Sequence, residues 1–143
     1  MYQLNNFLEK RSDFGETIMN SKTTFAVVDI ETTGTDMADN NRIIQFSCAI
    51  VANNRVVNTY VTDVNPQREV PKRIIQLTGI TPQRLKKAPT FDQISAKLYQ
   101  LLSGTVFVAH NVNFDFPFLN QEFQRVGYPE LSIDAIDTVT LSQ

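Results

Sequence analysis

Two kinds of apolar pattern predict the strands in the first half of the chain. Residues 25–31 form a short, mostly apolar run rich in β-branched side chains, which is typical of a buried strand, and a cluster of turn formers closes it. Apolar side chains then alternate with polar or small ones at 44–50 and again at 57–61, with Asn53 and Asn54 between the two runs. Asparagine tolerates the positive φ of tight turns, so this segment is predicted to be an antiparallel hairpin.

End signals predict two helices in the middle of the chain. Pro71 is able to open a short helix, because proline is tolerated in the first turn, and Gly79 ends it. A longer helix is predicted from the segment in which Thr90 and Gln93 have the spacing of a capping box. Apolar residues then repeat at helical intervals up to Gly104, which stands just past the end.

The last third of the chain is predicted to hold a buried strand and a third helix. Residues 105–109 are the strand, because they form a mostly apolar, β-branched run. Pro117 limits where the helix starts, so Asn113 is the predicted cap, Phe114 the first helical residue and Gly127 the stop. The apolar stripe of this helix is predicted to consist of Phe116, Leu119, Phe123 and Val126.

The end of the chain is predicted to add two more elements. Residues 131–136 are a short strand in this interpretation, and residues 137–143 are the first turns of another helix. The order of elements is then a strand, a hairpin, helices, a strand, a helix and a strand. This order predicts an α/β domain with a mixed β-sheet flanked by helices.

Length and composition fit one domain with a conventional core. The chain has 143 residues, 42% of them hydrophobic, and its one cysteine, Cys48, cannot form a disulfide within the chain. No apolar run reaches the ~18 residues of a membrane helix, and the first residues lack the pattern of a secretion signal. We therefore expect a cytoplasmic location and no membrane partner.

The charge of the chain narrows the classes of function. A net charge of −2 argues against a domain that binds nucleic acid mainly by neutralising many phosphates. Arg84, Lys86 and Lys87 form a small basic spot, which we expect to be a solvated loop. A metal-dependent enzyme acting on a phosphodiester stays open, because bound cations supply positive charge.

Three carboxylates are the candidates for metal binding. Asp29 and Glu31 lie two residues apart on a predicted strand, so their side chains leave the same face near its carboxyl end. Asp115 lies in the first turn of the predicted third helix, four residues before Leu119, and is expected to point towards the sheet. Such a cluster suits Mg²⁺ or Mn²⁺, which prefer oxygen ligands. The alternative is a solvated strand end and an ordinary charge at a helix N-terminus.

Three short segments carry a resemblance to a known family. They are residues 29–34 (DIETTG), 77–81 (LTGIT) and 110–115 (HNVNFD). The first and last resemble the first two motifs of the DEDD 3′→5′ exonucleases, the DnaQ-like family, and the middle one matches a segment that this family places against the substrate. The likeness spans residues 24–143 and is greatest to the exonuclease domains of Gram-positive DinG-type helicases and to DNA polymerase III epsilon-like proteins.

The resemblance implies an RNase H-like fold and a site for two divalent metals, Mg²⁺ or Mn²⁺, held by Asp29, Glu31, Asp115 and a fourth aspartate. In such a site a metal-bound water attacks the terminal phosphodiester. The implied substrate is the 3′ end of single-stranded DNA, which is hydrolysed to nucleoside monophosphates in DNA replication or repair. The implied substrate-binding residues are Thr32, Thr33, Thr78 and His110, with His110 in a positioning role.

The sequence departs from this family at the third motif of its DEDDh branch, His-x4-Asp. His110 is the only histidine of the 143 residues, and no aspartate follows Asp137. We therefore expect residues 23–143 to be an exonuclease domain that is truncated at its carboxyl end, weak or inactive alone, and part of a longer polypeptide with a helicase or polymerase. Residues 1–22 are expected to be an extension without assigned chemistry. Two alternatives stay open: an inactive module that binds nucleic acid or has a structural role, and a related exoribonuclease.

Overall fold

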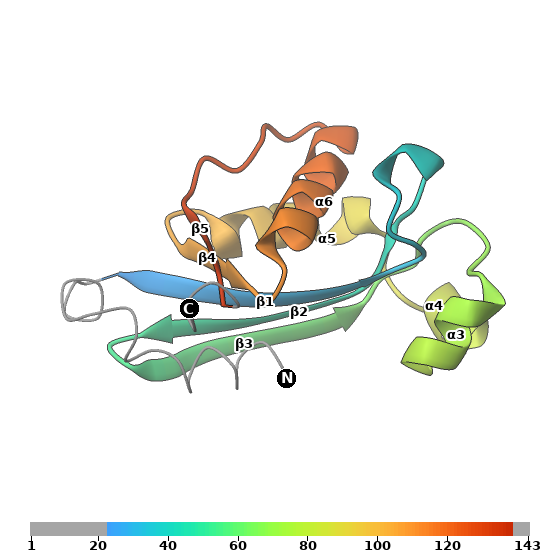
Figure 1. The fold of residues 1–143 in the computed structure, drawn as a ribbon, viewed down its shortest axis with the longest axis horizontal. Helices are drawn as coiled ribbons and strands as arrows, with labels where there is room; N and C mark the ends of the chain where they lie inside the picture. The colour runs from blue at the N-terminus through green and yellow to red at the C-terminus, as the bar shows by residue number, and fades with distance from the viewer. Residues whose placement is uncertain (1–22, 139–143) are drawn as a thin grey trace.

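The computed structural model describes residues 23–138, which form a mixed five-stranded sheet with the order β3-β2-β1-β4-β5 (Figure 1). β1 pairs with β2 and β2 with β3 in antiparallel fashion, whereas β4 is parallel to both β1 and β5. The predicted α/β class with a mixed sheet is confirmed. The strands are β1 (Thr24–Thr32), β2 (Ile43–Ala52), β3 (Arg55–Asp63), β4 (Val106–Ala109) and β5 (Ala135–Asp137).

The helices form two groups around this sheet. α5 and α6 lie over one face, and the short helices α3 and α4 form a lobe beyond the end of the sheet at which β1 ends (Figure 1). No helix among residues 23–138 is long and apolar enough to cross a membrane. The bounds are η2 (Met37–Asp39), α3 (Lys72–Thr78), α4 (Pro82–Lys86), α5 (Phe91–Leu102) and α6 (Val112–Arg125), where η2 is a single 3-10 turn.

The β2–β3 hairpin turns through Asn53 and Asn54, whose φ values of 53° and 63° are those of a type I′ turn. The predicted hairpin is therefore confirmed. Its first strand places Ser47 opposite Asp29 on β1. The end of β1 that carries the candidate carboxylates is thus paired with β2 through Glu31, and the register shifts between Glu31 and Thr32.

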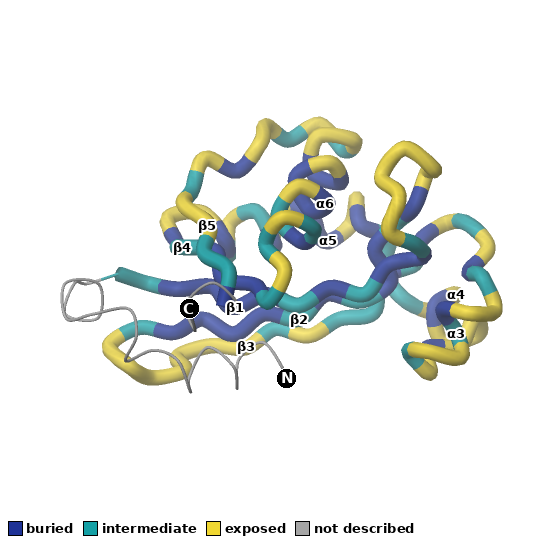
Figure 2. Tube along the Cα trace, in the orientation of Figure 1, coloured by how far each residue is buried: buried dark blue, intermediate teal, exposed yellow. Residues whose placement is uncertain are grey.

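The main core lies between the sheet and the layer formed by α5 and α6 (Figure 2). Ala26, Val28 and Ile30 of β1 face this layer and are buried. Phe25 and Val27 face the other side of the sheet, in a smaller cluster with Val51 and Val108. β1 is therefore buried on both faces, as its apolar run predicts.

α6 begins at Val112, so the prediction that Asn113 caps it is wrong. The carbonyl of Asn111 accepts hydrogen bonds from the N–H groups of the third and fourth helical residues at 2.9 and 3.0 Å. Pro117 consequently lies inside the helix, where its missing N–H leaves the carbonyl of the exposed Asn113 to water. The predicted stop is confirmed, because Gly127 follows the helix with a φ of 95°.

The buried side of α6 differs from the predicted stripe. Leu119 and Phe123 are fully buried as predicted, but Phe118 takes the deep position that was expected for the half-buried Phe116. The buried side includes Asp115 and Glu122. The predicted stripe differs from the observed buried side because a pattern of apolar residues alone assigns these two charged residues to the solvent.

The segment after α6 also differs from the prediction. The predicted strand begins only at Ala135, because the N–H of Leu131 donates to Asn120 Oδ1 at 2.8 Å and holds this part of the chain on α6. Asp137 pairs with Ala109 inside β5, so the prediction that it starts a helix is wrong. The remainder of that predicted helix, residues 139–143, and the predicted extension 1–22 lie outside the described residues.

Residues 84–87 are not the solvated loop that the sequence suggested. Arg84 and Lys86 lie in α4, and Lys87 follows its last turn. Pro82 occupies the first turn of this helix, and Thr81 Oγ1 accepts a hydrogen bond from the N–H of Arg84 at 3.3 Å. A threonine cap followed by proline is a start signal for a helix, and it explains the correction.

Candidate active site

Asp115 is buried where the first turn of α6 meets β1. It is 6% exposed, and the backbone of Ile30 donates a hydrogen bond to its carboxylate. Its Oδ2 atom has no hydrogen-bond partner within the described residues 23–138. A buried carboxylate oxygen in this state is unfavourable unless a proton or a cation occupies it.

Asp29 and Glu31 extend the acidic group along β1. Burial, followed by the charges of Asp29 and Glu31, raises the pKa of Asp115 from 3.8 to about 8. Burial and the neighbouring Asp29 also raise the pKa of Glu31. The structure therefore brings the three carboxylates singled out in the sequence within electrostatic reach of one another.

A fourth carboxylate, Asp137, joins this group from β5. It lies opposite Ala109, the last residue of β4, and its charge also raises the pKa of Asp115. Asp137 has no place in the site predicted from the sequence, because its segment was expected to begin a helix. The signal that could have found it is its place at the carboxyl end of a third parallel strand, where α/β sheets position their sites.

The chemistry of these side chains fits divalent cations, although they are not arranged as a finished metal centre. Among residues 23–138, no three Asp, Glu, His or Cys side chains stand close enough to share an ion. Carboxylate oxygens are nevertheless the ligands that Mg²⁺ and Mn²⁺ prefer, and Asp115 Oδ2 is buried without a hydrogen-bond partner in the same range. A shared cation would also relieve the repulsion that raises the pKa of Asp115 and of Glu31.

The loop between β1 and β2 is held by the buried side chain of Asn41. Its Oδ1 accepts from the hydroxyl of Thr33 at 2.8 Å, and its Nδ2 donates to a backbone carbonyl of the loop at 2.7 Å. Thr33 Oγ1 also accepts from the N–H of Arg42 at 3.0 Å, and the Thr32 hydroxyl donates to the carbonyl of Gly34 at 2.8 Å. The hydroxyls of both threonines are thus engaged within the loop.

Gly34 and Arg68 complete this arrangement. A Cβ at Gly34 would come within 2.8 Å of the amide atoms of Asn41, so a larger residue does not fit unless the amide moves. Arg68 reaches the loop from outside and donates through Nη1 to the carbonyl of Asn40 at 3.0 Å. The backbone that follows Glu31 is therefore held from both sides.

A buried ion-pair network supports the start of β2. Glu122 of α6 is 2% exposed, and its Oε1 lies 3.0 Å from Nε of Arg125 and 3.9 Å from Nε of Arg42. Arg42 directly precedes β2. The sequence does not predict this network, because a glutamate in a helix is ordinarily solvated.

Thr78 and His110, the other candidates for substrate binding, lie on different elements. The Thr78 hydroxyl donates to the carbonyl of Ile74 at 2.8 Å and accepts from the N–H of Ile80 at 3.2 Å, which closes the end of α3. His110 is half-buried and follows β4 directly. His110 therefore shares the sheet edge with the carboxylates, whereas Thr78 belongs to the lobe formed by α3 and α4.

Comparison with known sequences relates the chain to exonucleases. The family RNase_T, described as exonuclease, matches residues 26–143. The chain is 34% identical over 123 residues to the 3′-5′ exonuclease DinG of Bacillus subtilis, which aligns with 86% of this chain. It is 38% identical over 118 residues to the 3′-5′ exonuclease DinG of Staphylococcus epidermidis, which aligns with 82% of it. In both cases the chain spans 13% of the length of the relative.

Solved structures of exonuclease I share the fold. A product-bound structure has a TM-score of 0.74 at 23% identity, covering 85% of this chain and 31% of that one. The zinc-bound E. coli ExoI–ssDNA complex has a TM-score of 0.75 at 23% identity, covering 85% of this chain and 29% of that one. These matches confirm the RNase H-like fold. With the sequence relatives, they show that the chain belongs to the RNase T/DnaQ-like family of 3′→5′ exonucleases.

Proposed function

We propose that this chain binds the 3′ end of single-stranded DNA and hydrolyses its terminal phosphodiester, with Asp29, Glu31 and Asp115 as the metal-binding carboxylates. The observation that supports this proposal is the state of Asp115. It is buried, its Oδ2 lacks a hydrogen-bond partner among residues 23–138, and two carboxylates of β1 raise its pKa. A buried carboxylate with a purely structural role is ordinarily paired, whereas one that receives a cation is left open.

The three carboxylates would hold two divalent cations, Mg²⁺ or Mn²⁺. When bound, such ions supply Lewis-acid stabilisation of the charge that develops on the phosphate. The pKa of Asp115 is raised to about 8 in the metal-free protein, so this group would release a proton as ions bind, and affinity for the ions would rise with pH. The loop fixed by Asn41 holds the backbone beyond Glu31 in one position for the substrate.

The remaining assignments concern the terminal nucleotide. We assign Thr32, Thr33, Thr78 and His110 to its binding. The two adjacent threonines act through the backbone, because their hydroxyls are engaged in the loop. His110, the single histidine of the sequence, positions the substrate and is not the general base.

The relatives support a proposal for the cellular setting. The DinG proteins that match this chain are several times longer than it is. We infer that the unit works within a longer polypeptide, joined to a helicase or polymerase, and that its activity serves DNA replication or repair.

The test is release of nucleoside monophosphates from single-stranded DNA labelled at either end, which distinguishes removal from the 3′ end from removal from the 5′ end. We expect slow 3′ release that requires Mn²⁺ or Mg²⁺. The rate is low because general-base catalysis contributes ~10²–10⁴-fold and His110 does not supply it. Asp29→Ala and Asp115→Asn should abolish release, whereas Glu130→Gln, which changes an exposed carboxylate, should retain it.

Three results would overturn parts of this proposal. Binding of DNA ends without any release above the Asp115→Asn background would replace hydrolysis with an inactive binding module. Release from RNA but not from DNA would make the chain an exoribonuclease. Release that survives Asp115→Asn would remove this residue from the metal-binding set.

A further inference from the structure

The lobe formed by α3 and α4, residues 65–89, carries a large share of the positive charge of the chain. It contains six of the 13 lysines and arginines but one of the 15 acidic residues, so its net charge is +5 in a chain of net charge −2. Such an imbalance on one small surface attracts an anionic partner. The cations are Arg68, Lys72, Arg73, Arg84, Lys86 and Lys87.

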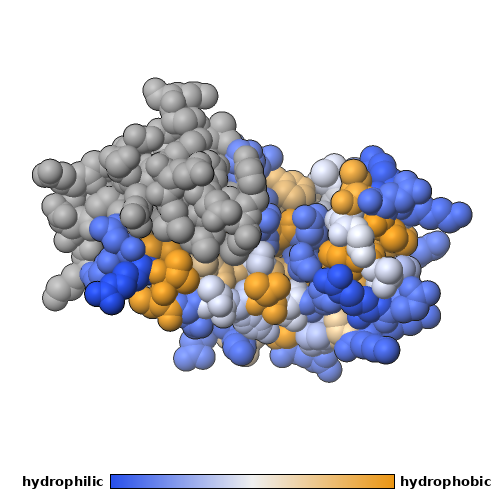
Figure 3. All heavy atoms as spheres, turned by 90° about the horizontal axis from the view of Figure 1, so that it is seen from below, coloured by the Kyte–Doolittle hydropathy of each residue, from blue (hydrophilic) through white to orange (hydrophobic). Residues whose placement is uncertain are grey.

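The lobe contains a hollow of about 530 Å³. Most of its apolar lining residues are buried or half-buried and form the floor. The exposed lining residues form the rim, namely Lys72, Lys86, Pro82 and Glu69, the one acidic residue of the lining. Seen from below, the end of the molecule formed by the lobe shows hydrophobic residues bordered by hydrophilic ones (Figure 3). The lining includes Val70, Ile75 and Leu85 on the apolar side and Arg68, Lys72 and Lys86 on the cationic side.

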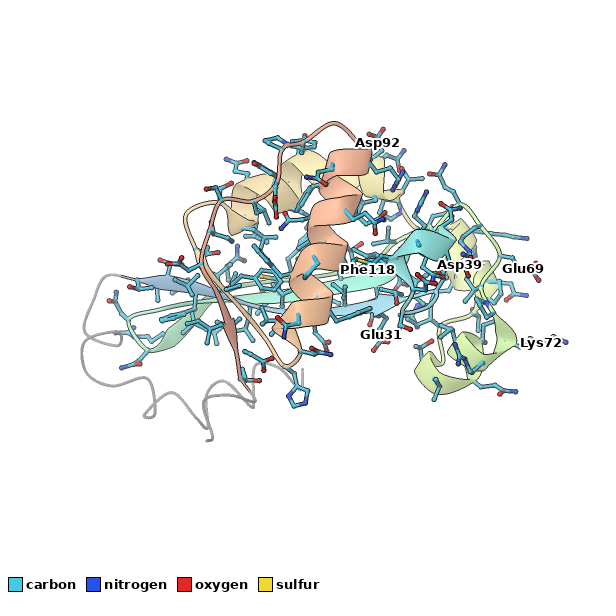
Figure 4. All side chains as sticks on the ribbon, turned by 45° about the horizontal axis from the view of Figure 1, so that its top comes forward. Glu31, Asp39, Glu69, Lys72, Asp92 and Phe118 are labelled. Atoms are coloured by element: carbon cyan, nitrogen blue, oxygen red, sulfur yellow. The ribbon has the colours of Figure 1, made fainter. Side chains whose placement is uncertain are left out.

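Arg68 connects this hollow to the candidate active site. It lines the hollow, and its Nη1 atom donates to the carbonyl of Asn40 at 3.0 Å and to Asn41 Oδ1 at 3.3 Å. Asn41 in turn holds Thr33, two residues beyond Glu31. Arg68 therefore joins the wall of the hollow to the loop that follows Glu31. Lys72 projects outward on the side of the lobe away from Glu31 (Figure 4).

The lobe is also fixed to the sheet at a second point. Arg84 of α4 binds both carboxylate oxygens of Asp63, the last residue of β3, with an Nη2–Oδ1 distance of 2.8 Å. The N–H of Val64 donates to the carbonyl of Ile44 on β2 at 2.8 Å. The position of the hollow relative to the carboxylates is consequently set by the fold, which favours binding of a ligand that spans both.

We propose that this hollow binds a nucleotide of single-stranded DNA upstream of the 3′ terminus, with the phosphate on Lys72 and Lys86 and the base or sugar on the apolar floor. The inference rests on the proposed function, because the same strand enters the carboxylate site. A nucleotide joins an anionic group to a flat apolar surface, which matches the mixed lining.

The test is equilibrium binding of single-stranded DNA in the Asp29→Ala background without divalent ions, so that no hydrolysis occurs. The test variant combines Lys72→Gln with Lys86→Gln. The charge-matched control combines Arg55→Gln with Lys97→Gln, at exposed positions outside the lobe. For single strands each phosphate contact contributes ~0.7 to the slope of log affinity against log salt concentration. Loss of two contacts should therefore reduce the slope by about 1.4 and the affinity roughly 25-fold at about 0.1 M salt.

We expect this loss in the test variant and not in the control. Equal slopes and equal affinities for the two variants would overturn the upstream subsite. A loss seen with RNA and not with DNA would overturn the assignment to DNA. Failure of the subsite is distinguishable from failure of the proposed function. The binding measurement needs no hydrolysis, and the comparison of nucleotide release between the wild type and Asp115→Asn does not involve the lobe.

Discussion

Replacing Asp115 with asparagine is expected to stabilise the metal-free protein at neutral and alkaline pH while it removes a proposed metal ligand. Asparagine has nearly the shape of a protonated aspartic acid and carries no charge. Asp115 is 6% exposed, and burial together with the charges of Asp29 and Glu31 raises its pKa to about 8. Without metal, the wild-type protein therefore either holds a proton on this group or buries a charge.

Proton linkage gives the sign and the size of the effect. Between the ordinary pKa of 3.8 and the folded value of about 8, the folded chain keeps a proton on Asp115 that the unfolded chain has released. Below about pH 4 the group is protonated in both the folded and the unfolded chain, and the free energy of unfolding has its full value. It falls by about 1.4 kcal/mol per pH unit until the folded group ionises near pH 8, a total on the order of 5 kcal/mol. Asp115→Asn does not titrate and avoids this loss.

Thermal unfolding with a chelator, from about pH 5 to about pH 9, measures the difference. For a chain of this length 1 kcal/mol corresponds to roughly 3–6 °C in Tm, so the variant should gain several degrees over the wild type with each pH unit. Glu130→Gln, which changes an exposed carboxylate, is the control and should follow the wild type. Mn²⁺ should raise the wild-type Tm near pH 8 by binding only the folded state, and should leave Asp115→Asn unchanged.

Parallel Tm curves for the wild type and Asp115→Asn would refute this reasoning, because they would mean that the carboxyl group titrates alike in the folded and unfolded chains. An equal Mn²⁺ shift in both proteins would refute the second half independently and would place the ion away from Asp115.

Three further predictions concern the loop, the ion pairs and the thiol. Gly34→Ala should lower the free energy of unfolding in urea by about 1–3 kcal/mol and should slow nucleotide release, because its Cβ would meet Asn41 at 2.8 Å. An unchanged rate and stability would contradict the role given to the loop between β1 and β2. Glu122→Ala should cost about 2 kcal/mol in the same assay, less than for a fully buried pair because both partner arginines are partly exposed, and a neutral effect would argue against the network. Cys48 is fully buried and its pKa is raised to about 12, so alkylation followed by mass spectrometry should label it only after unfolding; rapid labelling of the native protein would contradict its burial.

The elements that the sequence predicted well are those whose ends are marked by local contacts. The capping box at Thr90 forms as expected, with Gln93 Oε1 accepting from the Thr90 N–H at 3.0 Å. Gly79 ends α3 with a φ of 73°, a conformation that glycine adopts without strain. In each case the interacting residues stand a few positions apart, so the sequence pattern contains the cause of the structure.

The parts of the site that the sequence did not predict depend on contacts between distant residues. Arg68 and Asn41 are 27 positions apart, and neither belongs to a periodic pattern that would mark it. Asp137 joins the carboxylates because β5 pairs with β4, whereas its local sequence suggested a helix. The sequence did predict Asp29, Glu31 and Asp115 as candidates, because the position of a residue on a strand or in the first turn of a helix determines the direction of its side chain.

The separation of charge within this small domain bears on how an acidic chain would bind DNA, as we propose. Among residues 23–138, no lysine or arginine contributes to the pKa of Asp115 or of Glu31, whose shifts arise from burial and from other carboxylates. A lysine among these groups would neutralise them and compete with divalent ions for the same oxygens. The cations are gathered instead in the neighbouring lobe, where they leave the carboxylates available to metal. Under the proposed function, substitutions in the lobe should therefore alter the attraction of the DNA backbone, and substitutions in β1 should independently alter the binding of the ions.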